Sequence, residues 1–249
     1  MHSYRINLVS MLSLPIFIAL TLGSVNSFAA QSIASYAEKT KQSMATMQEK
    51  RTTWTAEDKA IMKAASDKLA NELPNPGLKA GNKAPNFALK NAFGQTIELK
   101  QELAKGPVVL IFYRGAWCPY CNLHLHALNN NLAEFEKYGA QVIAITPQSP
   151  DKSAEQVKKD GFPFQVLSDS TASVMKAYQL YFELPNDLMR IYKEHGLDIE
   201  AFNGEGRKGL PTPGAFIIDK NGIIRTMQAE VDYKTRMAPE AIIAALAAL

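Results

Sequence analysis

Residues 108–121 read VVLIFYRGAWCPYC, and this stretch decides the fold. Its first half, Val108–Tyr113, is a continuous β-branched and aromatic run, which predicts a strand buried on both faces of a sheet. Its second half places Cys118 and Cys121 three positions apart, where a helix is expected to begin. Because α/β sheets bind their ligands at strand ends, we expect the chemistry of this protein at this point.

The Cys-Pro-Tyr-Cys motif predicts a redox pair. A helix N-terminus offers unpaired N–H groups and the positive end of the helix dipole, which favour a thiolate over a thiol. Pro119 suits the first turn, where its missing N–H is not needed. Cys118 and Cys121 would share one face of that turn, close enough to form a reversible disulfide, and Trp117 places an apolar ring in front of them.

On both sides of this motif, strands and helices are expected to alternate. The predicted strands are 87–90, 96–99, 141–146, 164–167, 215–219 and 223–227, and the predicted helices are 118–138, 151–160, 171–179, 187–195 and a last one that starts at Pro239. Asn221-Gly222 between the last two strands is typical of a type I′ hairpin turn. Asp169 is expected to cap the helix that follows it. Residues 181–210 are expected to form a connector with one helix. This order predicts an α/β fold with a central mixed sheet flanked by helices.

Residues 1–29 have the features of an export signal. Arg5 is followed by an apolar stretch over residues 6–22, and Ser27 and Ala29 are small residues that suit cleavage after Ala29. Pro15 interrupts the apolar stretch, which is shorter than the roughly 20 residues that span a bilayer. We therefore expect a cleaved leader, a periplasmic or secreted protein, and no membrane contact after cleavage.

Residues 30–79 are expected to form a helical extension in front of a thioredoxin-like domain over residues 80–249. The apolar positions that share a helix face are Ile33, Ala37, Met44 and Met47 in the first helix, and Ile61, Ala65, Leu69 and Leu73 in the second. Thr55 and Asp58 resemble a capping box at the start of the second helix. Because both apolar stripes are thin, the pair is expected either to pack on the main domain or on a second subunit, which leaves a homodimer open, or to form an extension that docks only loosely.

The composition excludes several classes of protein. The chain has 249 residues, of which 47% are hydrophobic and 20% charged, as in soluble globular proteins. Its 27 Lys and Arg against 24 Asp and Glu give a net charge of +3, which is too small and too scattered to indicate a nucleic-acid partner. Two cysteines cannot build a disulfide framework, so the adjacent pair points to chemistry. We expect no cofactor and no metal.

Five segments carry a family resemblance: Phe87-Ala88-Leu89, Ile111-Phe112-Tyr113-Arg114-Gly115, Trp117-Cys118-Pro119-Tyr120-Cys121, Leu167-Ser168-Asp169 and Phe216-Ile217-Ile218-Asp219-Lys220-Asn221-Gly222. Together they resemble the thioredoxin-fold superfamily, and within it the peroxiredoxin-like branch of the alkyl hydroperoxide reductase/thiol-specific antioxidant (AhpC/TSA) family. The resemblance implies a thiol peroxidase that reduces hydrogen peroxide or alkyl hydroperoxides. It implies an external dithiol reductant such as a thioredoxin-like protein. It also places Thr212-Pro213 where the fold has a cis-proline that faces the active cysteines.

The motif departs from the family pattern Pro-x-x-x-Thr-x-x-Cys. Counted without gaps from Tyr113, Arg114 occupies the position of the family's proline. Cys118 occupies the position of the threonine, and Cys121 that of the cysteine that attacks peroxide. Pro213 replaces the family's second arginine. A count by the thioredoxin pattern instead makes Cys118 the exposed nucleophile and Cys121 its buried partner. We expect Cys118 to be the more exposed thiolate for disulfide exchange, and Cys121 to be the candidate that attacks peroxide.

Three functions fit these residues. A thiol peroxidase comes first, and a thiol–disulfide oxidoreductase for exported proteins, favoured by the intact motif, comes second. A metal-binding protein that uses the two sulfurs and His124 comes third. On a helix, His126 points away from the face that carries Cys118, Cys121 and His124. Surface positions are expected for both histidines. Arg114 is expected either to stabilise a thiolate or bound peroxide, or to pair with an acid at the strand end.

Overall fold

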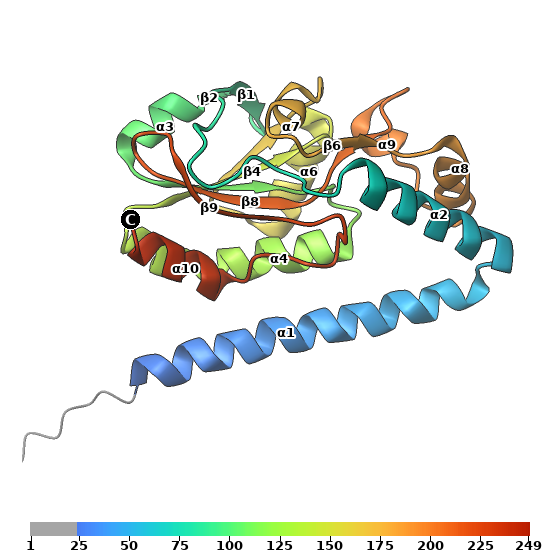
Figure 1. Ribbon diagram of the computed structural model, residues 1–249, viewed down its shortest axis with the longest axis horizontal. Coiled ribbons are helices and arrows are strands. Elements are labelled where there is room, and N and C mark those ends of the chain that lie inside the picture. Colours follow the sequence, from blue (N-terminus) through green and yellow to red (C-terminus); the bar gives the residue numbers. More distant parts are fainter. Residues whose placement is uncertain (1–23) are drawn as a thin grey trace, which may run out of the picture.

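A computed structural model describes residues 24–249, and it shows the expected mixed α/β fold (Figure 1). The strands are β1 Ala88–Asn91, β2 Thr96–Glu98, β3 Val108–Phe112, β4 Gln141–Thr146, β5 Gln165–Ser168, β6 Tyr181–Glu183, β7 Gly209–Pro211, β8 Gly214–Ile218 and β9 Ile224–Ala229. The helices are α1 Ser24–Lys50, α2 Ala56–Glu72, α3 Leu99–Lys105, α4 Pro119–Asn129, α5 Leu132–Glu136, α6 Pro150–Asp160, α7 Ser173–Ala177, α8 Asn186–Glu194, α9 Glu200–Asn203 and α10 Pro239–Ala247.

A seven-stranded sheet with the order β2-β1-β5-β4-β3-β8-β9 forms the centre of the molecule. β4 lies parallel to both β3 and β5, and the other pairs are antiparallel. All five residues of β3 are buried, as its continuous apolar run predicts. Val109 and Ile111 pack with α4 and α10 on one face, and Leu110 and Phe112 pack with α3 and α7 on the other (Figure 1). The end of β3 is thereby fixed from both sides.

The N-terminal extension packs on its own domain. α1 contacts α4 and α10, and α2 contacts α8 (Figure 1). The face predicted for α1 is met only in part, because Met47 packs against the core whereas Ala37 and Met44 are exposed, and the side chain of Ile33 lies outside the described burial. The face predicted for α2 is confirmed, since all four of its apolar positions are partly buried. The capping box is confirmed too, with both reciprocal hydrogen bonds present.

Most of the predicted leader lies outside the described residues, which begin at residue 24. Residues 24–29 form the first turns of α1, so the expected cleavage point after Ala29 falls within this helix. Within residues 24–249, no helix combines the length and the hydrophobicity that crossing a membrane requires.

Three local features differ from the sequence-based expectation. The predicted helix 118–138 is broken into α4 and α5 at Asn130 and Asn131, where the Asn131 amide donates to the carbonyl of Ala127. Residues 181–210 are more ordered than expected, because β6 and β7 pair there as a small antiparallel sheet. The β8–β9 turn is not type I′, since Gly222 has a positive φ of 78° and Asn221 does not. The carboxylate of Asp219, which accepts from the N–H groups of Asn221 and Ile223, stabilises this other turn.

Candidate active site

The two cysteines lie at the start of α4, after the loop that follows β3. Cys118 is the N-cap residue of α4, and Cys121 lies in its first turn. The prediction that Cys118 is exposed is wrong: only 1% of its surface is exposed, and Cys121 is fully buried. The predicted proximity is confirmed, because the thiol of Cys118 hydrogen-bonds to the sulfur of Cys121. The motif therefore forms a close but covered pair.

The pair is electrostatically asymmetric. Burial acts to raise the pKa of Cys121, but the Cys118 hydrogen bond and the charges of Arg236 and Arg114 outweigh it, so the pKa of Cys121 is lowered. Burial and the neighbouring Cys121 sulfur instead raise the pKa of Cys118. The surroundings therefore favour a thiolate at Cys121 and a protonated thiol at Cys118.

Arg236 is the functional residue that sequence reasoning missed. It lies in the segment between β9 and α10, and its Nη2 is 3.4 Å from the sulfur of Cys121. The sequence shows a polar patch around Asp232 and Arg236 but assigns it no role. Lys234 and Arg236 are the two cations of this segment, and their positions in the sequence give no sign of the contact with Cys121. Arg236 supplies a positive charge that the family pattern places before β8, where this chain has Pro213.

Arg114 lies under two aromatic rings. Its guanidinium carbon is 4.8 Å from the ring of Trp117 and 4.4 Å from that of Tyr233, which are cation–π distances. Burial acts to lower the pKa of Arg114, but Tyr192 and the two cysteines raise it, so the group stays charged. Its Nε is buried and has no hydrogen-bond partner among the described residues. No ion pair of Arg114 with an acid is present there either, so its geometry matches the thiolate-stabilising alternative.

A network of buried amides holds the loop before Cys118. Gln148 accepts a hydrogen bond from the N–H of Ala116 at 2.8 Å, and Asn122 donates to the carbonyl of Ala116 at 2.6 Å. Gln156 joins the two, donating to Asn122 and accepting from Gln148 and from the hydroxyl of Tyr113. Both backbone groups of Ala116 are therefore fixed, and with them the position of the helix start.

Gly115 in the same loop is required for the packing of Trp117. Its φ of 152° lies in a region that side chains rarely adopt, and a Cβ there would collide with the indole nitrogen of Trp117. A glycine at this position therefore lets the indole lie flat over the backbone just in front of Cys118.

Two neighbouring cavities lie near Arg114, and one of them reaches Cys118. The first, of about 340 Å³, is lined by Cys118, Pro119 and Trp117 together with aromatic residues of other elements. The second, of about 250 Å³, lies between α2 and α8 and includes Thr212 and Pro213 in its wall. The two cavities have three lining residues in common, which are Arg114, Tyr192 and Tyr233. Cys118 thus lines a cavity, whereas Cys121 lines neither of the two cavities.

The expectation for Thr212-Pro213 is not met. The peptide bond between them is trans, as are all the bonds of the described chain. The N–H of Thr212 already donates to the carbonyl of Leu180 at 2.8 Å, and the Thr212 hydroxyl bonds to the same oxygen. This backbone is therefore not free to pair with an incoming disulfide in the way that the resemblance implied.

The two histidines after the motif differ from each other. The surface prediction is wrong for His124, which is buried, with its Nε2 2.9 Å from the carbonyl oxygen of Met237. Burial and the charge of Arg236 lower the pKa of His124 to about 3. His126 is half-exposed, as expected. Within residues 24–249 no three His, Cys, Asp or Glu side chains gather in a way that could hold a metal ion.

This sheet, with a thiol pair at the start of the helix after β3, defines a protein of the thioredoxin-fold class. A sequence profile of the AhpC/TSA family matches residues 80–227, which is more than half of the chain. The chain therefore belongs to the AhpC/TSA family.

Known proteins agree with this assignment. Chloroplastic peroxiredoxin Q of Populus jackii is 28% identical over 160 residues, which cover 64% of this chain and 62% of that protein. The chain therefore spans less than two thirds of that relative. Thiol-disulfide oxidoreductase ResA of Halalkalibacterium halodurans is 28% identical over 127 residues, covering 51% of this chain and 69% of the relative. The crystal structure of peroxidoxin BcpB from Mycobacterium tuberculosis has a TM-score of 0.55 at 22% identity, covering 69% of this chain and 98% of that one, which shows a shared fold.

Proposed function

We propose that this protein is an oxidoreductase, a thiol-dependent peroxidase that reduces hydrogen peroxide or alkyl hydroperoxides through Cys118 and Cys121. The observation that carries the proposal is the position of Cys121, whose sulfur receives a hydrogen bond from Cys118 and lies 3.4 Å from Arg236. A thiolate is the form of cysteine that attacks peroxides, and this arrangement favours it. Family membership and the likeness to peroxiredoxin Q support the same assignment.

The proposed reaction has two steps. The thiolate of Cys121 attacks the outer oxygen of the peroxide, so that an S–O bond forms, the O–O bond breaks and the leaving oxygen takes up a proton as water or an alcohol. Cys118 then attacks the sulfur of the resulting sulfenic acid, which forms the disulfide and releases water. An external dithiol, such as a thioredoxin-like protein, returns the pair to the reduced state. Because Cys118 faces the cavity, the hydrogen bond between the two sulfurs must open before peroxide reaches Cys121.

Two single-cysteine variants test this assignment. Reduced wild type, Cys118→Ser and Cys121→Ser are mixed with hydrogen peroxide or an alkyl hydroperoxide in the presence of a sulfenic-acid trap, and the products are identified by mass spectrometry. We expect trapped sulfenic acid on Cys121 in Cys118→Ser, an internal disulfide in wild type, and little product in Cys121→Ser. Trapping on Cys118 alone would reverse the roles of the two sulfurs. If wild type consumes peroxide no faster than free cysteine does, the peroxidase assignment fails.

Thiol–disulfide exchange is the second candidate, supported by the likeness to ResA. It predicts that the reduced protein reduces a model protein disulfide and that Cys121→Ser traps a mixed disulfide through Cys118. The burial of Cys118 and the occupied N–H of Thr212 place this function second, because a protein substrate must reach both. If the protein neither reduces the model disulfide nor forms the mixed disulfide, thiol–disulfide exchange is ruled out as its function.

We also propose export to the periplasm or beyond, based on the leader-like composition of residues 1–29. Cell fractionation together with mass determination of the mature N-terminus tests it. A protein found in the cytoplasm with residues 1–29 intact would overturn it.

A further inference from the structure

The cavity over Cys118 is larger than hydrogen peroxide requires. Its volume is about 340 Å³, whereas a water molecule occupies roughly 30 Å³ in the liquid and hydrogen peroxide is larger by only one oxygen atom. The residues that give its wall an aromatic character are Trp54, Trp117, Tyr120, Tyr192 and Tyr233. A cavity of this size with apolar walls and a few polar groups is typical of a small-molecule site.

One polar group is positioned to orient a ligand there. Arg114 is only 4% exposed, lines this cavity beside Cys118, and carries a buried Nε that has no hydrogen-bond partner within the described chain. An oxygen acceptor next to Cys118 would satisfy this donor after a small adjustment. The site therefore combines an apolar wall with one cationic donor close to the reacting sulfurs.

Part of the wall comes from outside the family domain. Met47, Thr53 and Trp54 belong to the N-terminal extension, and Tyr233 follows the last residue that the family profile matches. The indole of Trp54 stacks on the ring of His195, with the ring centres 4.5 Å apart and the planes 18° apart. This segment thus contributes part of the cavity wall.

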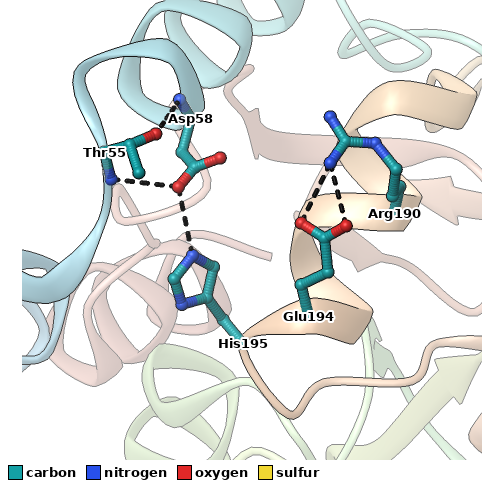
Figure 2. Close-up of polar contacts among 5 residues, drawn as sticks. All are labelled: Thr55, Asp58, Arg190, Glu194 and His195. Atoms are coloured by element: carbon teal, nitrogen blue, oxygen red, sulfur yellow. Dashed lines mark hydrogen bonds and ion pairs between the residues drawn. The ribbon is translucent and has the colours of Figure 1, made fainter.

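Next to Trp54 in the sequence, Thr55 takes part in a polar contact that links the start of α2 with the end of α8 (Figure 2). Thr55 and Asp58 form the capping box of α2, and the same carboxylate oxygen of Asp58 lies 3.3 Å from Nε2 of His195, which ends α8. Arg190 and Glu194, which precede His195 on α8, pair with each other (Figure 2). The start of α2 and the end of α8 are therefore joined directly beside the aromatic wall.

We propose that this cavity binds the bulky apolar group of an organic hydroperoxide, by preference an aromatic one, and that Trp54 determines this specificity. The proposal rests on the peroxidase function proposed above and adds to it a substrate class and a binding role for the extension. The ring of the substrate packs between Trp54 and Trp117, and its peroxide oxygens lie at Arg114 and the sulfurs. Hydrogen peroxide leaves most of the wall without contact.

The test compares cumene hydroperoxide, an aromatic hydroperoxide, with hydrogen peroxide. Second-order rate constants for oxidation of the reduced full-length protein are measured for wild type, Trp54→Ala, Trp54→Phe and the control Met44→Ala, which alters an exposed side chain of the same extension. We expect wild type to react at least about tenfold faster with cumene hydroperoxide. Trp54→Ala should lose about tenfold with this substrate and change less than about threefold with hydrogen peroxide. Trp54→Phe should keep most of the preference, and Met44→Ala all of it.

Two results would overturn the proposal and leave the peroxidase assignment intact. One is a wild type that reacts equally fast with both peroxides. The other is a preference that survives in Trp54→Ala, with circular dichroism showing that the variant is folded. Should Trp54→Ala not fold, a folded Trp54→Phe variant whose rate constants fall by the same large factor with both peroxides would also count against the proposal. Failure of wild type to react with either peroxide would instead remove the peroxidase function itself.

Discussion

The guanidinium of Arg236 lies 3.4 Å from the sulfur of Cys121, although 115 positions separate them in the sequence. This contact joins the segment before α10 to the first turn of α4. It gives the buried thiol a positive neighbour, and the hydrogen bond from Cys118 adds to the effect. A residue outside the motif therefore supplies part of the positive charge that lowers the pKa of Cys121.

Removal of the Arg236 charge should raise the pKa of Cys121. In Arg236→Met the thiolate loses a nearby cation, so we expect its absorbance at 240 nm to appear at higher pH than in wild type. Peroxide consumption at pH 7 should fall on the order of tenfold. The control is Lys234→Met, which removes a cation of the same segment that pairs with Asp232 instead. An unchanged titration in Arg236→Met would show that the contact does not stabilise the thiolate.

His124 should make the folded protein sensitive to acid. Its pKa is about 3 in the folded state, whereas a histidine of an unfolded chain takes up a proton near pH 6.5. Between these values the unfolded chain binds the extra proton, so the free energy of unfolding falls as the pH drops below about 6.5, by up to about 1.4 kcal/mol per pH unit.

Urea unfolding of the reduced protein over a pH series measures this effect. His124→Gln, which keeps a donor for the carbonyl of Met237, should reduce the loss of stability between pH 6.5 and 4. His126→Gln, on the half-exposed side of the same helix, serves as the control and should retain the wild-type slope. Equal slopes in all three proteins would contradict the assignment of the acid sensitivity to His124.

Asp58 should hold the start of α2 in place. Asp58→Ala removes the acceptor for the N–H of Thr55 and for His195, so we expect a loss of about 1 kcal/mol in local stability. Amide hydrogen exchange in the first turn of α2 should become correspondingly faster. Asp67→Ala is the matched control, because Asp67 lies exposed on the same helix and pairs with Lys63, a contact expected to contribute under about 0.5 kcal/mol. Similar exchange in both variants would show that the capping box does not fix the extension.

Asp169 should contribute to global stability. Its buried carboxylate accepts hydrogen bonds from the N–H groups of Val174 and Met175 and from the hydroxyl of Ser173, as its predicted capping role requires. Asp169→Ala leaves these donors without a partner and should lower the free energy of unfolding by roughly 2 kcal/mol. Urea unfolding measures the change, and Asp151→Ala, in the exposed first turn of α6, should alter it by less than about 0.5 kcal/mol. A cost for Asp169→Ala as small as that of the control would contradict this role.

The sequence was most informative where the signals are local. The apolar run Val108–Tyr113 predicts β3 to within one residue, Gln141–Thr146 predicts β4, and Pro239 marks the start of α10. The Thr55 capping box follows from side chains that bond to backbone three positions away. Such features need no knowledge of what packs against them, and for that reason they could be predicted.

Features that depend on distant packing could not be predicted. Cys118 is buried and lines a cavity whose wall includes Trp54 and Tyr233, which lie far from it in the sequence. The pairing of β6 with β7 joins three-residue strands across a long connector, so neither strand has a periodic signal of its own. The contact of Arg236 depends in the same way on how the segment before α10 folds back over α4.

The aromatic wall over Cys118 has a further use. The chain contains two tryptophans, and both Trp54 and Trp117 line this cavity. Their intrinsic fluorescence therefore originates entirely from the surroundings of the cysteine pair. Any event that alters these surroundings will change an optical signal that the protein carries without a label.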